Sequence, residues 1–317
     1  MKTRGITEGA MFCALGVILT LVSYYIPLFT ILVFFIPVPM VVLGKRQGLK
    51  VSILSSLAAT ILIGLFLGPI TAITFGALML LVGCSLGYAY NKNLSPVRKV
   101  IIGVAGFAVL MVAIVAVYEF MMGISFTTLI FESMEISTKE VLSFYESTNI
   151  MDANQLTTAK DAMTANMQMM KLALPSAFLL LPMMFGMVNV LISDFILKRI
   201  GYQVTSFKPL GQWEMPTSLK YFLMFFLFGD FIISIFQVTT IPQIYIVTVM
   251  NFVNIIFYIM GLSLIFNYME YKKVNNKGLK VLVVFLSFII ISIITLVGVA
   301  DTYIGIRQIF RRESQIK

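Results

Sequence analysis

Long apolar runs alternate with short polar or basic connections along almost the whole chain. The runs lie at residues 8–27, 28–43, 49–67, 70–90, 99–122, 173–197, 219–239, 243–268 and 279–300. An α-helix needs about 20 mainly apolar residues to cross the hydrocarbon core of a bilayer. The pattern therefore predicts an all-α, polytopic integral membrane protein with about eight or nine transmembrane helices.

Two of these runs leave alternatives open. The second is short and contains Pro37 and Pro39, so it is expected to be tilted, broken or partly re-entrant. The ninth would place the basic tail, residues 305–317, on the outer side of the membrane. Either this last run turns back on itself, or the tail is an exception to the charge rule for membrane loops.

Basic residues cluster on one set of connections. They are Lys2, Arg4, Lys45, Arg46, Lys50, Lys92, Arg98, Lys99, Lys198, Arg199, Lys208, Lys220, Lys272, Lys273, Lys277 and Lys280, whereas the alternate connections near 25–29, 68–70 and 238–242 carry no charge. Because cytoplasmic loops are enriched in Lys and Arg, the N-terminus is predicted to be cytoplasmic, in a multi-pass protein of the cell membrane. Most of the net charge of +9 is then an orientation signal rather than a nucleic-acid surface.

The charge pattern divides the chain into three parts. Residues 1–123 hold the first five spans, 124–171 form an extracytoplasmic helical segment, and 172–317 hold spans six to nine and the basic tail. The middle segment carries a stripe with helical spacing, made of Leu156, Met163, Met167, Met170 and Leu174. Methionine clusters can bind copper(I), but with no His or Cys nearby the stripe favours helix packing or contact with the membrane surface, and no metal site is predicted.

Composition narrows the chemistry further. The chain is 59% hydrophobic, 12% charged and contains no histidine, which excludes histidine acid–base catalysis and the usual zinc and haem ligands. The two cysteines, Cys13 and Cys84, lie inside apolar runs. No phosphate-binding loop, H-E-x-x-H or C-x-x-C motif is present, so we expect neither an enzyme nor a cofactor, and a transporter would need an ion gradient or a separate ATPase subunit.

Polar residues inside the runs are the candidate functional residues. Asp230 lies in FFLFGDFIISIF, ten residues after Lys220, which places it roughly 15 Å into the membrane, where a charge needs a function or a partner. Asn254 in the following run falls at nearly the same depth, so an antiparallel neighbour would offer Asp230 an amide donor. A ligand or coupling role and a structural hydrogen-bonded carboxylate both remain open for Asp230. The other candidates are Asn251, Asn189 and Glu119.

Small residues with helical spacing mark one face of the first run. Gly9 and Cys13 are four residues apart, and Ala10 and Ala14 form an A-x-x-x-A pair beside them. Small residues at this spacing allow another helix to approach the backbone closely. The face is therefore either a docking surface for a partner or an internal packing surface.

Four segments resemble the YybS family of predicted bacterial membrane proteins over nearly the whole chain. They are TRGITEGAMFCALGVIL, FFIPVPMVVLGKRQGLK, NIIFYIMGLSLIFNYMEYKK and GVADTYIGIRQ. The last is similar to a closing G-x-x-D…R pattern of the family, here Gly298, Asp301 and Arg307. Where the family often has an aromatic–Asp pair before the arginine, this chain has Ile304, Gly305 and Ile306, and that departure argues against a role for an Asp–Arg pair.

The first six runs also resemble the substrate-binding subunits of energy-coupling-factor vitamin importers. The likeness rests on Ala10 and Ala14, the proline-containing second run and the basic turn LGKRQG. It implies docking to a transmembrane coupling protein driven by ATPase subunits, and an unknown small-molecule ligand near the outer face. The alternative is a membrane scaffold or regulator of envelope or signalling processes with no transported substrate.

Overall fold

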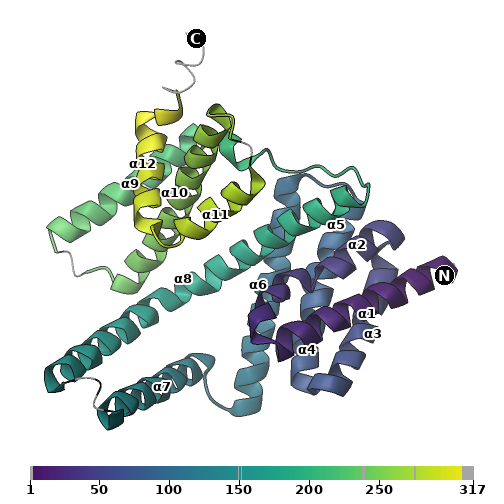
Figure 1. Ribbon diagram of the computed structural model, residues 1–317, viewed down its shortest axis with the longest axis horizontal. Helices are drawn as coiled ribbons and strands as arrows, with labels where there is room; N and C mark the ends of the chain where they lie inside the picture. Colours follow the sequence, from purple (N-terminus) through teal and green to yellow (C-terminus); the bar gives the residue numbers. More distant parts are fainter. Residues whose placement is uncertain (1–2, 149, 151, 238–239, 275, 309–317) are drawn as a thin grey trace. The chain divides into compact units, whose positions relative to one another are not determined.

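The chain folds into helices joined by short connections (Figure 1). A computed structural model describes residues 3–148, 150, 152–237, 240–274 and 276–308, and no strand occurs among them. Eight helical segments in this described part are long and apolar enough to cross a membrane, and a bent pair near the C-terminus would make a ninth. The predicted all-α, multi-pass architecture is confirmed, while the cytoplasmic location of the N-terminus stays a prediction.

The chain divides into two compact units. The first comprises residues 1–167 and 177–206, and the second comprises 168–176 and 207–317. The three parts predicted from the sequence are defined by whether the chain lies inside or outside the membrane. That organisation therefore stays a prediction.

The first unit is built from the N-terminal helices. They are α1 (Thr3–Tyr25), η1 (Pro27–Phe35), α2 (Val38–Gln47), α3 (Leu49–Leu67), α4 (Pro69–Ala77), η2 (Leu78–Cys84), α5 (Ser85–Asn91) and α6 (Pro96–Met122). The second predicted run changes helix type within one candidate span, Pro27–Gln47, because the 3₁₀-helix η1 ends before Pro37 and Pro39 lies in the first turn of α2. Proline fits there since its missing N–H would have no partner within the helix.

Close backbone packing holds α2 against α5. A Cβ atom on Gly44 would lie 2.8 Å from the Cα of Gly87, so glycine at both positions lets the two helices approach more closely than any side chain would allow. The largest fully buried side chains of the unit include Ile36, Met40, Leu43, Ile63, Met79 and Leu86.

The segment predicted to lie outside the membrane is helical. It forms α7 (Phe126–Thr148) and the first part of α8 (Ala153–Arg199). At 47 residues, α8 is about 70 Å long, more than twice the roughly 30 Å of a hydrocarbon core. Its start is fixed by a capping box, in which the Asp152 carboxylate accepts from the Gln155 N–H and the Gln155 side chain accepts from the Asp152 N–H.

The second unit surrounds α10 (Gln243–Tyr271). The other helices are η3 (Leu210–Gln212), α9 (Thr217–Ile235), α11 (Lys277–Ser287) and α12 (Ile291–Ile304). Its core consists of Met215, Leu223, Val253, Phe257 and Met260. The helix axis turns by 103° between α11 and α12, as in a broken span or a re-entrant segment, so both alternatives for the last run stay open. The tail beyond Gln308, including Arg311, Arg312 and Lys317, lies outside the described residues.

Candidate functional site

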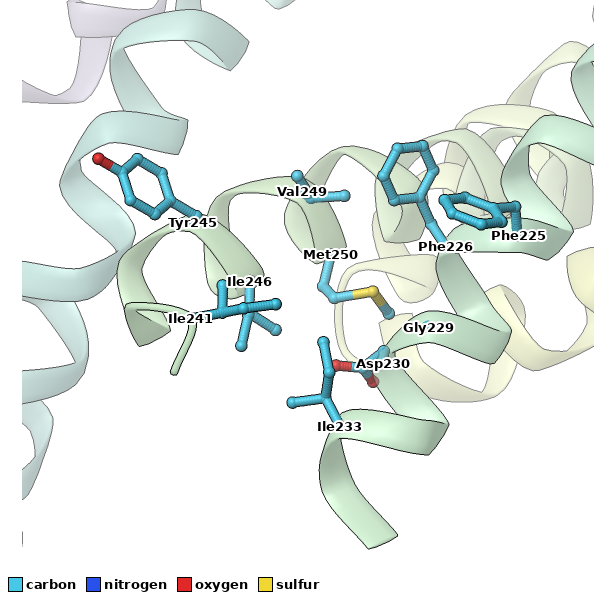
Figure 2. Close-up of a pocket in the computed structure, with 10 residues that line it drawn as sticks. All are labelled: Phe225, Phe226, Gly229, Asp230, Ile233, Ile241, Tyr245, Ile246, Val249 and Met250. Atoms are coloured by element: carbon cyan, nitrogen blue, oxygen red, sulfur yellow. The ribbon is translucent and has the colours of Figure 1, made fainter. Parts of the chain in front are cut away.

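Asp230 lines an apolar cleft between α9 and α10 (Figure 2). The cleft has a volume of about 290 Å³ and is lined by Phe225, Phe226, Gly229, Asp230, Ile233, Ile241, Tyr245, Ile246, Val249 and Met250. Asp230 is half-buried, and Figure 2 shows its carboxylate projecting from α9 beside Met250, with the Tyr245 ring at the far end of the cleft. The described residues provide this carboxylate with neither a hydrogen bond nor an ion pair.

The predicted pairing of Asp230 with Asn254 is wrong. Met250 lies opposite the carboxylate, about one helical turn closer to the α9–α10 connection than Asn254. Asn254 is exposed, while Asn251 donates from Nδ2 to Ser176 Oγ at 2.8 Å. Equal depth does not make two side chains face each other, because the rotation and shift of two packed helices are set by side-chain packing.

Asn189 and Glu119 have local structural contacts. Asn189 is fully buried and its Nδ2 donates to the carbonyl of Phe185, one turn earlier in α8. Glu119 Oε1 accepts from the Phe126 N–H at 3.0 Å and from Ser125 Oγ at 3.2 Å. Glu119 therefore satisfies a free donor at the start of α7 and joins the end of α6 to it.

The small-residue face of α1 is divided between two roles. Gly9 and Cys13 are buried, and a Cβ on Gly9 would lie 2.8 Å from Ser55 Oγ of α3, so this half serves internal packing. Ala10 and Ala14 are exposed. They line a groove of about 500 Å³ between α1 and α3, together with Gly5, Ile6, Gly9, Cys13, Val51, Leu54, Ser55, Ala58 and Leu62.

Asp301 and Arg307 form a buried ion pair, although the chain departs from the family pattern between them. Arg307 Nε donates to Asp301 Oδ2 at 2.8 Å and a terminal nitrogen lies 2.6 Å from the same oxygen. The backbone N–H of Arg307 donates to the other carboxylate oxygen at 3.0 Å. Gly305 makes this possible, since its φ of 76° ends α12 in a left-handed turn and brings the chain back on itself. Gly305 belongs to the stretch that differs from the family pattern, and its left-handed turn allows the ion pair to form.

Residues 207–216, which lead into α9, lie against α10. The Asp301–Arg307 ion pair helps to hold them there. The Arg307 guanidinium donates to the carbonyl of Trp213. Ser263 Oγ donates to the carbonyl of Leu210 at 2.7 Å, and Asn267 Nδ2 donates to that of Gly211 at 2.9 Å. The sequence indicated neither of these α10 residues, although their spacing of four places both on one face.

Gly298 has a packing role. It lies where α12 crosses α10, and a Cβ there would overlap the carbonyl of Phe257. Gly261 on α10 faces the carbonyl of Ile294 in the same way. Two glycines thus allow backbone contact between the two helices.

A second buried charge cluster went unnoticed in the sequence. Lys99, treated there as a loop charge, is 1% exposed and lies 3.4 Å from Asp194 Oδ1, with its Nζ 2.6 Å from the carbonyl of Thr205. Its ammonium is 4.2 Å from the ring centroid of Tyr90, whose hydroxyl donates to Asp194 Oδ1 at 2.6 Å. Lys99 follows directly after the basic loop, so hydropathy alone could not separate it from its exposed neighbour Arg98.

The sequence is similar to known membrane proteins over most of its length. The model of a family described as "Predicted membrane protein (DUF2232)" matches residues 14–302. The chain belongs to this family. It is also 26% identical over 323 aligned positions to "Uncharacterized protein YybS" of Bacillus subtilis (strain 168), covering 96% of this chain and 98% of that protein.

The family match confirms the resemblance to the YybS family and the multi-pass membrane location. It includes Gly298 and Asp301 and ends before Arg307. No solved structure matches the chain.

Proposed function

We propose that this DUF2232 protein is the membrane-embedded, solute-binding subunit of a small-molecule uptake system and docks a transmembrane partner through the α1–α3 groove. The observation that carries the proposal is the exposure of Ala10 and Ala14 on the groove, while Gly9 and Cys13 beside them are used in internal packing. Internal packing therefore does not account for the two alanines.

The groove has the chemistry of a helix-docking surface. Its base is formed by small residues of α1 and α3, and its rim by Ile6, Leu54 and Leu62, which are 58%, 53% and 39% exposed. Helices associate in a bilayer through such close packing, because lipid tails are as apolar as the side chains and supply no hydrophobic drive. A partner that provides ATPase activity would also explain the lack of a phosphate-binding loop in this sequence.

A membrane scaffold or regulator is the second candidate function. The long α8 favours it, since α7 and the first part of α8 offer a helical surface beyond the length that a bilayer covers. On this surface, the side chains of Ile136 and Phe144 in α7 are each 57% exposed. This candidate predicts partners that bind the α7–α8 segment. It also predicts that filling the groove changes the uptake of no solute.

Co-purification from native membranes tests the groove. We expect the tagged chain to retain a transmembrane partner and to lose it when Ala10→Leu or Ala14→Leu fills the groove. Ala113→Leu is the matched control, because Ala113 of α6 is exposed and lies outside the groove. Each variant must first be shown to insert and to keep its helical circular dichroism.

Solute uptake separates the two candidate functions. Deletion of the protein should slow depletion of at least one small molecule from the growth medium, measured by mass spectrometry. The wild-type chain and Ala113→Leu should restore depletion, and Ala14→Leu should not. If deletion changes the depletion of no solute, the uptake proposal is refuted and the scaffold is favoured.

A further inference from the structure

The Asp230 cleft lies entirely in the second unit, whereas the groove of the proposed function belongs to the first. Two helices form it: α9 supplies Phe225, Phe226 and Asp230, and the start of α10 supplies Ile246 and Met250 (Figure 2). At about 290 Å³, it is close to the lower size limit of small-molecule sites, roughly 300 Å³. The cleft could hold a compact ligand or the apolar part of a larger one.

Asp230 is the only acidic or basic residue among those that line the cleft. It follows Lys220 by ten residues of α9, which is about 15 Å along the helix axis and near the centre of a hydrocarbon core of roughly 30 Å. A carboxylate at that depth is costly unless a positive charge or donors compensate it. Its expected internal donor, Asn254, is exposed and does not reach it.

The surroundings of the carboxylate define what could compensate it. Met250 and Ile233 lie beside it, while Phe225, Phe226 and Tyr245 provide aromatic surface. Phe225 and Tyr245 are 71% and 64% exposed, so their rings are available to a ligand. A positive charge is attracted both to a carboxylate and to aromatic faces, and a hydrated inorganic ion would find no further oxygen ligands among these side chains.

We propose that the Asp230 cleft binds a lipophilic organic cation, such as a quaternary ammonium or phosphonium compound, with the charge beside Asp230 and the apolar body along Met250 toward Tyr245. The site is independent of the α1–α3 groove and of any partner docked there. It assigns to α9 and α10 a ligand-binding activity that does not depend on the uptake proposal.

Binding of radiolabelled tetraphenylphosphonium to the full chain in lipid nanodiscs tests the site. Empty nanodiscs give the background from partition into lipid. We expect saturable binding at one site per chain, and an affinity at least about tenfold lower in Asp230→Asn, because the isosteric amide keeps the shape of the cleft but removes its charge. Asp161→Asn removes the same charge from an exposed position of α8 and should bind as the wild type does.

Filling the cleft is the complementary test. A Cβ on Gly229 meets no atom within 4 Å, so Gly229→Leu places a side chain in the cleft with Asp230 retained, and it should abolish saturable binding. Helical circular dichroism and the fluorescence of Trp213, the only tryptophan, report whether each variant is folded. Absence of saturable binding to the wild type, or equal affinity in folded Asp230→Asn, would overturn the proposal.

Triphenylphosphine oxide provides the charge control, because it carries three phenyl groups on phosphorus but no net charge. An excess should leave bound tetraphenylphosphonium in place after subtraction of the lipid background. Displacement as effective as that by unlabelled tetraphenylphosphonium would show an apolar surface without charge selection and would contradict the proposal.

Discussion

The Asp301–Arg307 pair allows a quantitative prediction about the second unit. Arg307→Met keeps most of the apolar stem but removes every donor of the guanidinium. Asp301, 5% exposed, would then keep a buried carboxylate with only the backbone N–H of residue 307 as a donor. Removing one partner of a buried ion pair costs about 3–5 kcal/mol, chiefly because the other charge remains buried and unpaired.

The carbonyl of Trp213 would lose the guanidinium donor in the same variant and keep only the Ser263 hydroxyl, 3.1 Å away. Because Trp213 is the only tryptophan, its fluorescence reports the site directly. Equilibrium unfolding in mixed micelles with increasing SDS should show a free energy of unfolding lower by about 3–5 kcal/mol and an earlier change in Trp213 emission. Arg98→Met is the matched control, since Arg98 is exposed, and it should change stability by less than about 0.5 kcal/mol.

The double variant Asp301→Leu with Arg307→Met isolates the pair itself. An apolar replacement of both charges leaves neither one unpaired, so it should be less destabilising than Arg307→Met alone. Stability of Arg307→Met within about 0.5 kcal/mol of the wild type would refute the reasoning, because no buried charge could then have been left unpaired.

Three further predictions concern the helix contacts. Lys99→Met should lower the melting temperature in detergent more than Lys99→Met combined with Asp194→Asn, because the single variant leaves a buried carboxylate without its ammonium; additive losses would contradict this. Gly298→Ala should lower the free energy of unfolding by about 1–3 kcal/mol, because its Cβ would overlap α10. The control Gly229→Ala should leave this free energy unchanged or raise it by up to about 1 kcal/mol. Equal effects of the two substitutions would show that α12 does not pack closely on α10. Ser263→Ala should speed hydrogen exchange in residues 207–216 without unfolding α10, and unchanged exchange would mean that other contacts hold this connection.

Helix positions could be predicted from the sequence because hydropathy along one helix is a local property. The apolar runs at 49–67 and 243–268 correspond closely to α3 and α10. The irregular second run also followed from local chemistry, since Pro37 and Pro39 lie where the 3₁₀-helix η1 gives way to α2 and each lacks a backbone N–H donor.

Contacts between helices could not be predicted in the same way. Asp230 and Asn254 were matched by depth alone, but packing places Met250 opposite Asp230. Lys99 lies next to a basic loop in the sequence and was therefore treated as a loop charge. It is buried beside Asp194, which lies 95 positions later in the chain. Such pairings depend on how helix surfaces interlock, which no single segment encodes.

The most direct test of the groove is photo-crosslinking in native membranes from a benzophenone amino acid placed at Leu54, a large exposed residue on the rim of the groove. The account predicts an adduct with one transmembrane polypeptide that disappears when Ala10→Leu fills the groove, and no such adduct when the probe replaces Ala113. Adducts with lipid alone at Leu54, or the same protein adducts at both positions, would contradict the claim that this groove docks a partner.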